Sequence, residues 1–244
     1  MRTRIRHGLA AVLAVSALSL TAACGGGDAK GDTKKDKAAD KPAAGQTTSA
    51  APAPATPLTA AQMKAAALEL KDLPSGWKVD KAQEEDPTVY KADKPECEAV
   101  ATLMADKVAG ATTGASADFE RGNSESLLSQ QVMTFPGTGA VDYVKKIGTS
   151  LETCTGFSAE MEGMKMKITL QKLTAPQGAQ EAQAFRMKMN ITDVNVTVES
   201  NLLVAAQGTG LTRFAHVPAD ASGHKDFDGF AKLAADKFVK GAQS

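Results

Sequence analysis

The second half of the chain consists largely of stretches in which apolar and polar residues alternate. The apolar positions are Met164, Met166, Ile168 and Leu170, then Phe185, Met187, Met189 and Ile191, then Val194, Val196 and Val198, with the pattern continuing to Leu202 and Val204. Alternation with a period of two gives a strand one apolar and one polar face, as in antiparallel sheets. Thr192-Asp193 is suited to a tight hairpin turn, and residues 211–217 are expected to form the last strand. The pattern predicts an antiparallel meander of about four strands.

Helical patterns occupy much of the remaining domain. Thr59 and Gln62 have the spacing of a capping box, in which each side chain bonds to the other residue's backbone, so a helix is expected from there to about Leu70. Apolar residues also recur at helical spacing over 95–108, over 140–154 and from about 223 onward, whereas 117–121 and 125–135 are expected to be strands. This order of elements predicts an α+β fold in which helices pack on one face of a single antiparallel sheet.

The N-terminal region, residues 1–23, has the layout of an export signal. Arginines within residues 2–6 precede an apolar run over 9–20, which is shorter than the roughly 20 residues that a membrane-spanning helix needs. The small residues before Cys24 resemble the bacterial lipobox. The resemblance implies cleavage after Ala23 and attachment of a diacylglyceryl group, with fatty acids such as palmitate, to the Cys24 sulfur. The alternative is an ordinary secreted protein with an incidental cysteine.

Residues 24–57 form the lipidated cysteine and a linker. From Gly25 to Pro57 the chain has no large apolar side chain, its charges alternate, and an Ala-Pro repeat covers 51–55. Such a segment cannot bury enough apolar surface to fold, so it is expected to be a disordered tether that spans about 30 Å on average. The folded domain is expected over 58–244.

The cysteines are consistent with export. Lipidation of Cys24 leaves Cys97 and Cys154, both on the apolar side of predicted helices. An even number of cysteines in an exported chain is typical of disulfide pairing, so we expect one intradomain disulfide, which would contribute roughly 4 kcal/mol. The alternatives are two free thiols or part of a metal site, although neither cysteine has the C-x-x-C spacing of a zinc or redox site.

Charge excludes some classes of partner. Lysine plus arginine and aspartate plus glutamate number 28 each, but three arginines belong to the signal peptide, so the mature chain carries a small net negative charge. Such a chain has neither the basic surface of a nucleic-acid-binding protein nor a polybasic patch for lipid headgroups. The expected membrane contact is the covalent lipid on Cys24, which would hold the protein on the extracytoplasmic face of the cell membrane.

The sequence offers few candidates for catalysis. Only His216 and His224 follow the signal peptide, and G-x-S-x-G, H-E-x-x-H and Walker motifs are missing from the sequence. Both histidines are therefore interpreted as structural or surface residues rather than as a base beside a nucleophile. The acidic stretches at Glu84–Asp86 and at Asp226 and Asp228 supply too few oxygen ligands for calcium. No catalytic residue, metal or cofactor is expected.

Two unusual features have competing interpretations. Met161, Met164 and Met166 are soft thioether ligands that would suit Cu(I), but the last two continue into an apolar strand face, where methionine fills gaps in a core. Trp77, the single tryptophan, follows Pro74 and Gly76 in a turn and is expected to pack that turn onto the core. A role as a platform for a ligand is the alternative.

Taken together, the Leu73–Trp77 turn, the helices that carry Cys97 and Cys154, and the late hairpins resemble the PknH-like extracellular sensor domain, a family found on actinobacterial receptor kinases and on free lipoproteins. The resemblance covers roughly 58–244. It implies a bent antiparallel sheet with helices, a broad cleft, and ligand sensing without catalysis. Kinase-borne members carry two disulfides, whereas this chain has cysteines for one. With neither a kinase domain nor a transmembrane helix expected, the chain is not expected to signal inward alone.

Three functions follow as hypotheses. The first is a lipid-anchored, non-catalytic binding or sensor domain for a small molecule, glycan or lipid of the cell envelope. The second is an accessory envelope lipoprotein that docks another protein. The third is a hydrolase, which would require at least three acidic or histidine groups to converge in a pocket. An apolar cleft would favour the first hypothesis, and a flat exposed apolar patch would favour the second.

Overall fold

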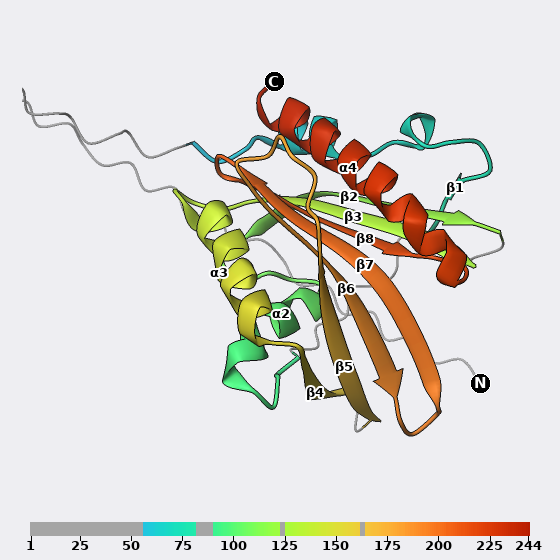
Figure 1. The fold of residues 1–244 in the computed structure, drawn as a ribbon. Helices are drawn as coiled ribbons and strands as arrows, with labels where there is room; N and C mark the ends of the chain where they lie inside the picture. The colour runs from blue at the N-terminus through green and yellow to red at the C-terminus, as the bar shows by residue number, and fades with distance from the viewer. Residues whose placement is uncertain (1–55, 82–89, 123–124, 162–163) are drawn as a thin grey trace, which may run out of the picture. The chain divides into compact units, whose positions relative to one another are not determined.

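A computed structural model describes residues 56–81, 90–122, 125–161 and 164–244, in which helices pack on a single antiparallel sheet (Figure 1). The strands of this described part are β1 (Lys78–Val79), β2 (Thr112–Arg121), β3 (Ser126–Thr134), β4 (Gly156–Met161), β5 (Met164–Leu173), β6 (Glu181–Ile191), β7 (Val196–Gln207) and β8 (Gly210–Val217). They lie in the order β1-β2-β3-β8-β7-β6-β5-β4, with antiparallel neighbours throughout. The α+β class and the antiparallel sheet are confirmed.

The helices of the described residues range from single turns to four turns. The α-helices are α1 (Ala60–Ala66), α2 (Glu98–Ala101), α3 (Gly139–Thr153) and α4 (Phe227–Ala242), and the 3-10 helices are η1 (Leu70–Asp72), η2 (Pro95–Cys97), η3 (Thr102–Met104) and η4 (Ala221–Asp226). In the part of the chain that the structure describes, no helix combines the length and apolar character needed to cross a bilayer.

Helices cover both faces of the sheet, which corrects the prediction that they pack on one face. In β7 the neighbours Leu203 and Val204 point to opposite faces, and both are buried. Val204 packs in the core that includes α3, whereas Leu203 packs in the core that includes α4. We call these two sides of the sheet the α3 face and the α4 face. The sequence of residues 202–206, Leu-Leu-Val-Ala-Ala, is the unbroken apolar run of a strand buried on both sides.

The predicted strands exist, but some boundaries and turns were wrong. The β6–β7 hairpin turns over residues 192–195, with Asn195 in the left-handed region at φ 51°, rather than over Thr192-Asp193 alone. Val194 therefore lies in the turn. Strand β4 was not predicted, so the second half of the sheet has one more strand than expected. Strand β2 also begins at Thr112, five residues before the predicted start of that strand at residue 117.

The capping box at the start of α1 is confirmed. The Gln62 backbone nitrogen donates to Thr59 Oγ1 at 3.2 Å, and the Thr59 backbone nitrogen donates to Gln62 Oε1 at 2.9 Å. The helix ends at Ala66 instead of continuing to Leu70. Helix α1 packs against the C-terminal end of α4 at Gly241, where an added Cβ would lie 2.4 Å from the Ala66 backbone nitrogen. Glycine is thus required for this close helix contact.

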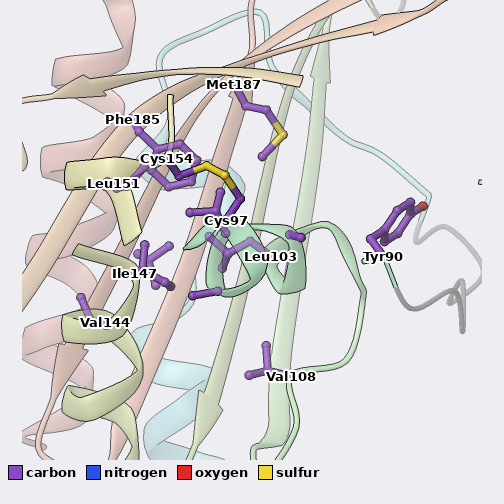
Figure 2. Packing of buried hydrophobic residues seen from close by; sticks show 14 of the residues in the cluster. Tyr90, Cys97, Leu103, Val108, Val144, Ile147, Leu151, Cys154, Phe185 and Met187 are labelled. Carbon is purple, nitrogen blue, oxygen red and sulfur yellow. A yellow bond between two sulfur atoms is a disulfide. The ribbon is translucent and has the colours of Figure 1, made fainter. Parts of the chain in front are cut away.

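The Cys97–Cys154 disulfide is confirmed, with Cα atoms 5.2 Å apart. Both cysteines are buried, and the bond joins η2 to the residue that caps the C-terminus of α3. Figure 2 shows the bridge in the core of the α3 face, with Leu103 and Leu151 nearby. The disulfide therefore fixes the segment that contains η2, α2 and η3 against α3.

That segment does not form the continuous helix predicted over 95–108. It is divided into η2, α2 and η3, and the chain then runs over the sheet. The carbonyl oxygens of Leu103, Ala105 and Asp106 accept hydrogen bonds from the Arg213 side chain of β8. Because these carbonyls turn toward the sheet, they are not available for a helical ladder. A long-range contact thus overrides the local helical pattern.

Candidate functional site

A cavity of about 160 Å³ lies on the α3 face of the sheet. Its wall is the 103–106 segment that follows α2, and its floor comes from β3, β7 and β8. The lining residues are Leu103, Met104, Ala105, Asp106, Ser129, Gln131, Leu202, Leu203, Val204, Arg213, Phe214 and Ala215. Polar and apolar side chains share this lining, which is the mixture found in sites for small organic ligands.

Arg213 is one of the two charged residues of the cavity lining, and Asp106 is the other. Its Nη1 donates to the carbonyl oxygen of Ala105 at 2.8 Å and of Leu103 at 3.4 Å, and its Nη2 donates to that of Asp106 at 2.9 Å. Nη2 also donates to the Gln131 side-chain oxygen. All four acceptors are neutral groups, so hydrogen bonding holds the 103–106 segment to the sheet without neutralising the guanidinium charge.

The surroundings of Arg213 are only partly polar. Burial lowers the pKa of the Arg213 guanidinium below its ordinary value, while electrostatic interactions with Tyr143 and Asp106 oppose that change. Burial also raises the pKa of the Tyr143 hydroxyl, which lies 3.2 Å from the hydroxyl of Thr102. Arginine stays charged in proteins, so the guanidinium keeps its positive charge in this desolvated setting, with Asp106 in the same lining.

The segment that forms the cavity wall is fixed to α3 at residues 96–97. The Cys97–Cys154 disulfide and a hydrogen bond from the Ser150 hydroxyl to the Glu96 carbonyl tie the 96–97 region to the end of α3. The Arg213 bonds hold the other end of the same segment. With both ends fixed, the cavity is largely formed in the absence of a ligand, as is usual for small-molecule sites.

A second polar cluster lies on the α4 face. The Nε2 atom of His224 is 3.1 Å from Glu199, and its Nδ1 atom is 2.9 Å from the Asn201 amide nitrogen. Glu199 also pairs with Lys188 at 2.8 Å, and hydrogen bonding to Lys188 is the main reason why the pKa of Glu199 is lowered. The cluster contains a histidine and a carboxylate but no serine, cysteine or threonine nucleophile within these contacts. It holds η4 to β7.

His216 is a core residue. Its ring packs edge-on against Phe230 at 5.3 Å, and its side chain is 1% exposed. Burial lowers the pKa of His216 to about 4, while Asp226 has the opposite effect. The Nδ1 atom of His216 and the Nε1 atom of Trp77 have no hydrogen-bond partner among the described residues. A neutral imidazole in an apolar setting matches the structural interpretation of this histidine.

The other predicted site residues are placed as follows. Trp77 is buried, contacts Phe230 with ring centroids 5.5 Å apart, and has the Arg121 guanidinium 5.0 Å above its ring. It therefore packs the turn onto the core, as predicted. Cys24 and Glu84–Asp86 lie outside the described residues, so lipid attachment at Cys24 stays a prediction.

Metal binding is not supported by clustered ligands in the described residues. Within them, no group of three or more histidine, cysteine, aspartate or glutamate side chains is arranged to hold a metal ion. Met166 is buried in the core of the α3 face, which agrees with a packing role. The side chain of Met161 lies outside the described part, so Cu(I) binding by Met161, Met164 and Met166 is untested.

Arg213 and Gln131 were not predicted from the sequence. A signal was present, because Arg213 occupies an inward position of the predicted last strand, between Leu211 and Ala215 on the same face. A charged residue at a position that periodicity assigns to the core requires partners or a ligand. Gln131 carried no comparable signal, since only the pairing of β3 with β8 brings it beside Arg213.

Comparisons with known proteins show the fold. The chain is similar to the crystal structure of the extracellular domain of PknH from Mycobacterium tuberculosis, with a TM-score of 0.54 and 14% sequence identity over 78% of this chain and 99% of that one. No protein-family model matches the sequence, and neither does any curated protein. The predicted likeness to the PknH extracellular domain is thus confirmed at the level of fold.

Proposed function

We propose that the protein is a lipid-anchored, extracytoplasmic lipoprotein whose folded domain binds a small molecule of the cell envelope without catalysis. The cavity against Arg213 carries this proposal. Its lining combines the Arg213 guanidinium, Asp106, the Gln131 amide and apolar side chains, and both ends of the segment that forms its wall are fixed. Such a site is built to retain a ligand rather than to transform one.

Several observations support an extracytoplasmic, non-enzymatic role. The fold is that of an extracellular domain, and a buried disulfide is typical of oxidising compartments. Hydrolysis would require a nucleophile beside a base, whereas the His224–Glu199 pair has Asn201 and Lys188 as its other partners. The predicted lipobox ending at Cys24 supplies the anchor.

Binding is tested by native mass spectrometry of the chain from residue 24, with Cys24→Ser, purified without detergent. We expect a bound small mass that disappears in the cavity-filling variant Ser129→Phe. The control is Thr169→Phe, which adds the same ring at an exposed position of β5 and should keep the bound mass. A bound mass equally present in both variants would contradict the assignment to this cavity, and a stable protein partner instead of a small mass would favour a docking function.

Anchoring is tested separately on the full chain by partition between detergent and aqueous phases. The natural chain should enter the detergent phase, and Cys24→Ala should stay in water, because stable anchoring needs two or more acyl chains. An intact mass without added lipid would refute the anchor and leave the binding proposal unaffected.

A further inference from the structure

The α3 face has an apolar strip that α3 and the 103–106 segment do not fully bury. It follows β6 and β7 toward their hairpin, where Figure 1 shows both strands extending beyond α4. Its members are apolar and partly or largely exposed, and they are Met189, Ile191, Val196, Val198 and Leu202. Val196 is 45% exposed. We call these five residues the apolar strip.

The opposite face of the same strand segments is polar. There the side chains of Lys188, Asn190, Thr197 and Glu199 alternate with those of the apolar strip. An antiparallel sheet that has one face in water is expected to be polar on that face, and this side meets the expectation. The apolar strip does not, and a contiguous exposed apolar surface on a folded domain marks a binding site.

The strip and the cavity described above meet at Leu202, although the half-buried Ser200 separates Val198 from Leu202 on this face of β7. Leu202 belongs to both, and it is paired across the sheet with Ala215, another residue of the cavity lining. Met189 lies opposite Val198, and Ile191 lies opposite Val196, so the strip is two strands wide. Residues 196–202 of a strand span about 20 Å, which exceeds the roughly 15 Å that the acyl chains of one bilayer leaflet span.

The cavity at the end of the strip is small, and its lining carries two charged residues, Arg213 and Asp106. Its volume of about 160 Å³ equals that of about five water molecules, which is enough for a head group but not for a long chain. The four hydrogen bonds of Arg213 go to neutral acceptors. Of these, the Gln131 side chain can be replaced by a ligand oxygen without moving the backbone. Guanidinium binds carboxylate and phosphate oxygens through paired charge-assisted hydrogen bonds.

Building on the proposed function, we infer that the ligand is a single-chain anionic amphiphile, whose carboxylate or phosphate head meets Arg213 and whose hydrocarbon chain lies along the apolar strip. The charge selects the head, and the strip selects the chain. An anion without a hydrocarbon chain would make no use of the apolar strip, and a neutral hydrocarbon would make no use of Arg213. A ligand with both parts accounts for the cavity and the strip together.

The test uses the chain from residue 24 with Cys24→Ser and measures binding calorimetrically to three probes. Dodecanoate has both parts of the proposed ligand, butyrate has the head with a short chain, and dodecan-1-ol has the chain without charge. We expect dodecanoate to bind one to one and at least tenfold more tightly than either of the others. Equal affinity for dodecanoate and dodecan-1-ol would refute the role of Arg213, and equal affinity for dodecanoate and butyrate would refute the role of the strip.

Variants of the strip and of Arg213 test where the ligand's hydrocarbon chain and head group bind. Val198→Glu should weaken dodecanoate binding at least tenfold, because it places a negative charge where the hydrocarbon chain would lie. The control Thr197→Glu adds the same charge on the α4 face of the same strand and should leave affinity within twofold. Arg213→Gln should abolish the preference for dodecanoate over dodecan-1-ol, and the probe series on the natural sequence decides the question if this variant does not fold.

Other results overturn the inference in distinct ways. If dodecanoate does not bind although native mass spectrometry finds another small molecule in the cavity, the proposed function stands and the ligand class is wrong. If neither is found, both are wrong. Sedimentation with vesicles of anionic phospholipid, without binding of free dodecanoate, would show that the protein contacts a lipid surface and not a single amphiphile.

Discussion

Reduction of the Cys97–Cys154 disulfide is expected to lower the free energy of unfolding by about 4 kcal/mol. The bond closes a loop between residues separated by 57 positions, and a loop of this length restricts the unfolded chain strongly. Both sulfur atoms lie in the core of the α3 face, so the folded state keeps its packing when the two thiols form. The loss therefore comes mainly from the greater freedom of the unfolded chain.

The assay is unfolding in urea with and without a phosphine reductant, followed by the fluorescence of Trp77, the single tryptophan, which is 5% exposed in the folded state. With a slope of about 2 kcal/mol per molar urea, the midpoint should fall by about 2 M on reduction. The slope itself should rise, since the reduced unfolded chain exposes more surface.

The control for this experiment is the double variant Cys97→Ala and Cys154→Ala, whose unfolding should not respond to the reductant. Cys24→Ser is included in both proteins so that the outcome reports on one bond. An unchanged midpoint after complete reduction of the natural pair, checked by alkylation, would refute the loop-entropy reasoning.

Two further predictions concern α4 and the core beneath it. Gly241→Ala should destabilise the domain by about 1–3 kcal/mol, because the new Cβ would lie 2.4 Å from the Ala66 backbone nitrogen. Gly229→Ala in the same helix should stabilise the domain by about 0.5–1 kcal/mol, because its new Cβ would have no other atom within 4 Å. Similar midpoints in urea for the two variants would contradict this. Between pH 6.5 and pH 4 the free energy of unfolding of the natural protein should fall by about 3 kcal/mol more than that of His216→Phe. The reason is that His216 binds a proton in the unfolded chain over this range, whereas burial lowers its pKa to about 4 in the folded protein. Parallel pH profiles of the two proteins would exclude the predicted contribution of His216.

The sequence by itself determined the elements whose signals are local. Alternation over 164–170 and 185–191 predicted β5 and β6, and the Thr59–Gln62 spacing predicted the capping box of α1. The disulfide was also predictable, since Cys97 and Cys154 are the cysteines that lie beyond the predicted lipidation site. Such features depend on neighbours within a few residues or on simple counting, so no knowledge of strand pairing is needed.

Only the tertiary structure decided which faces of the sheet are covered and where the cavity lies. The pairing of β3 with β8 brings Gln131 beside Arg213, and Arg213 in turn draws the 103–106 carbonyls away from a helix. Periodicity gives the face of a residue within its strand but not the neighbour across the sheet. The cavity and the apolar strip are products of that register, which arises from contacts between residues far apart in the chain.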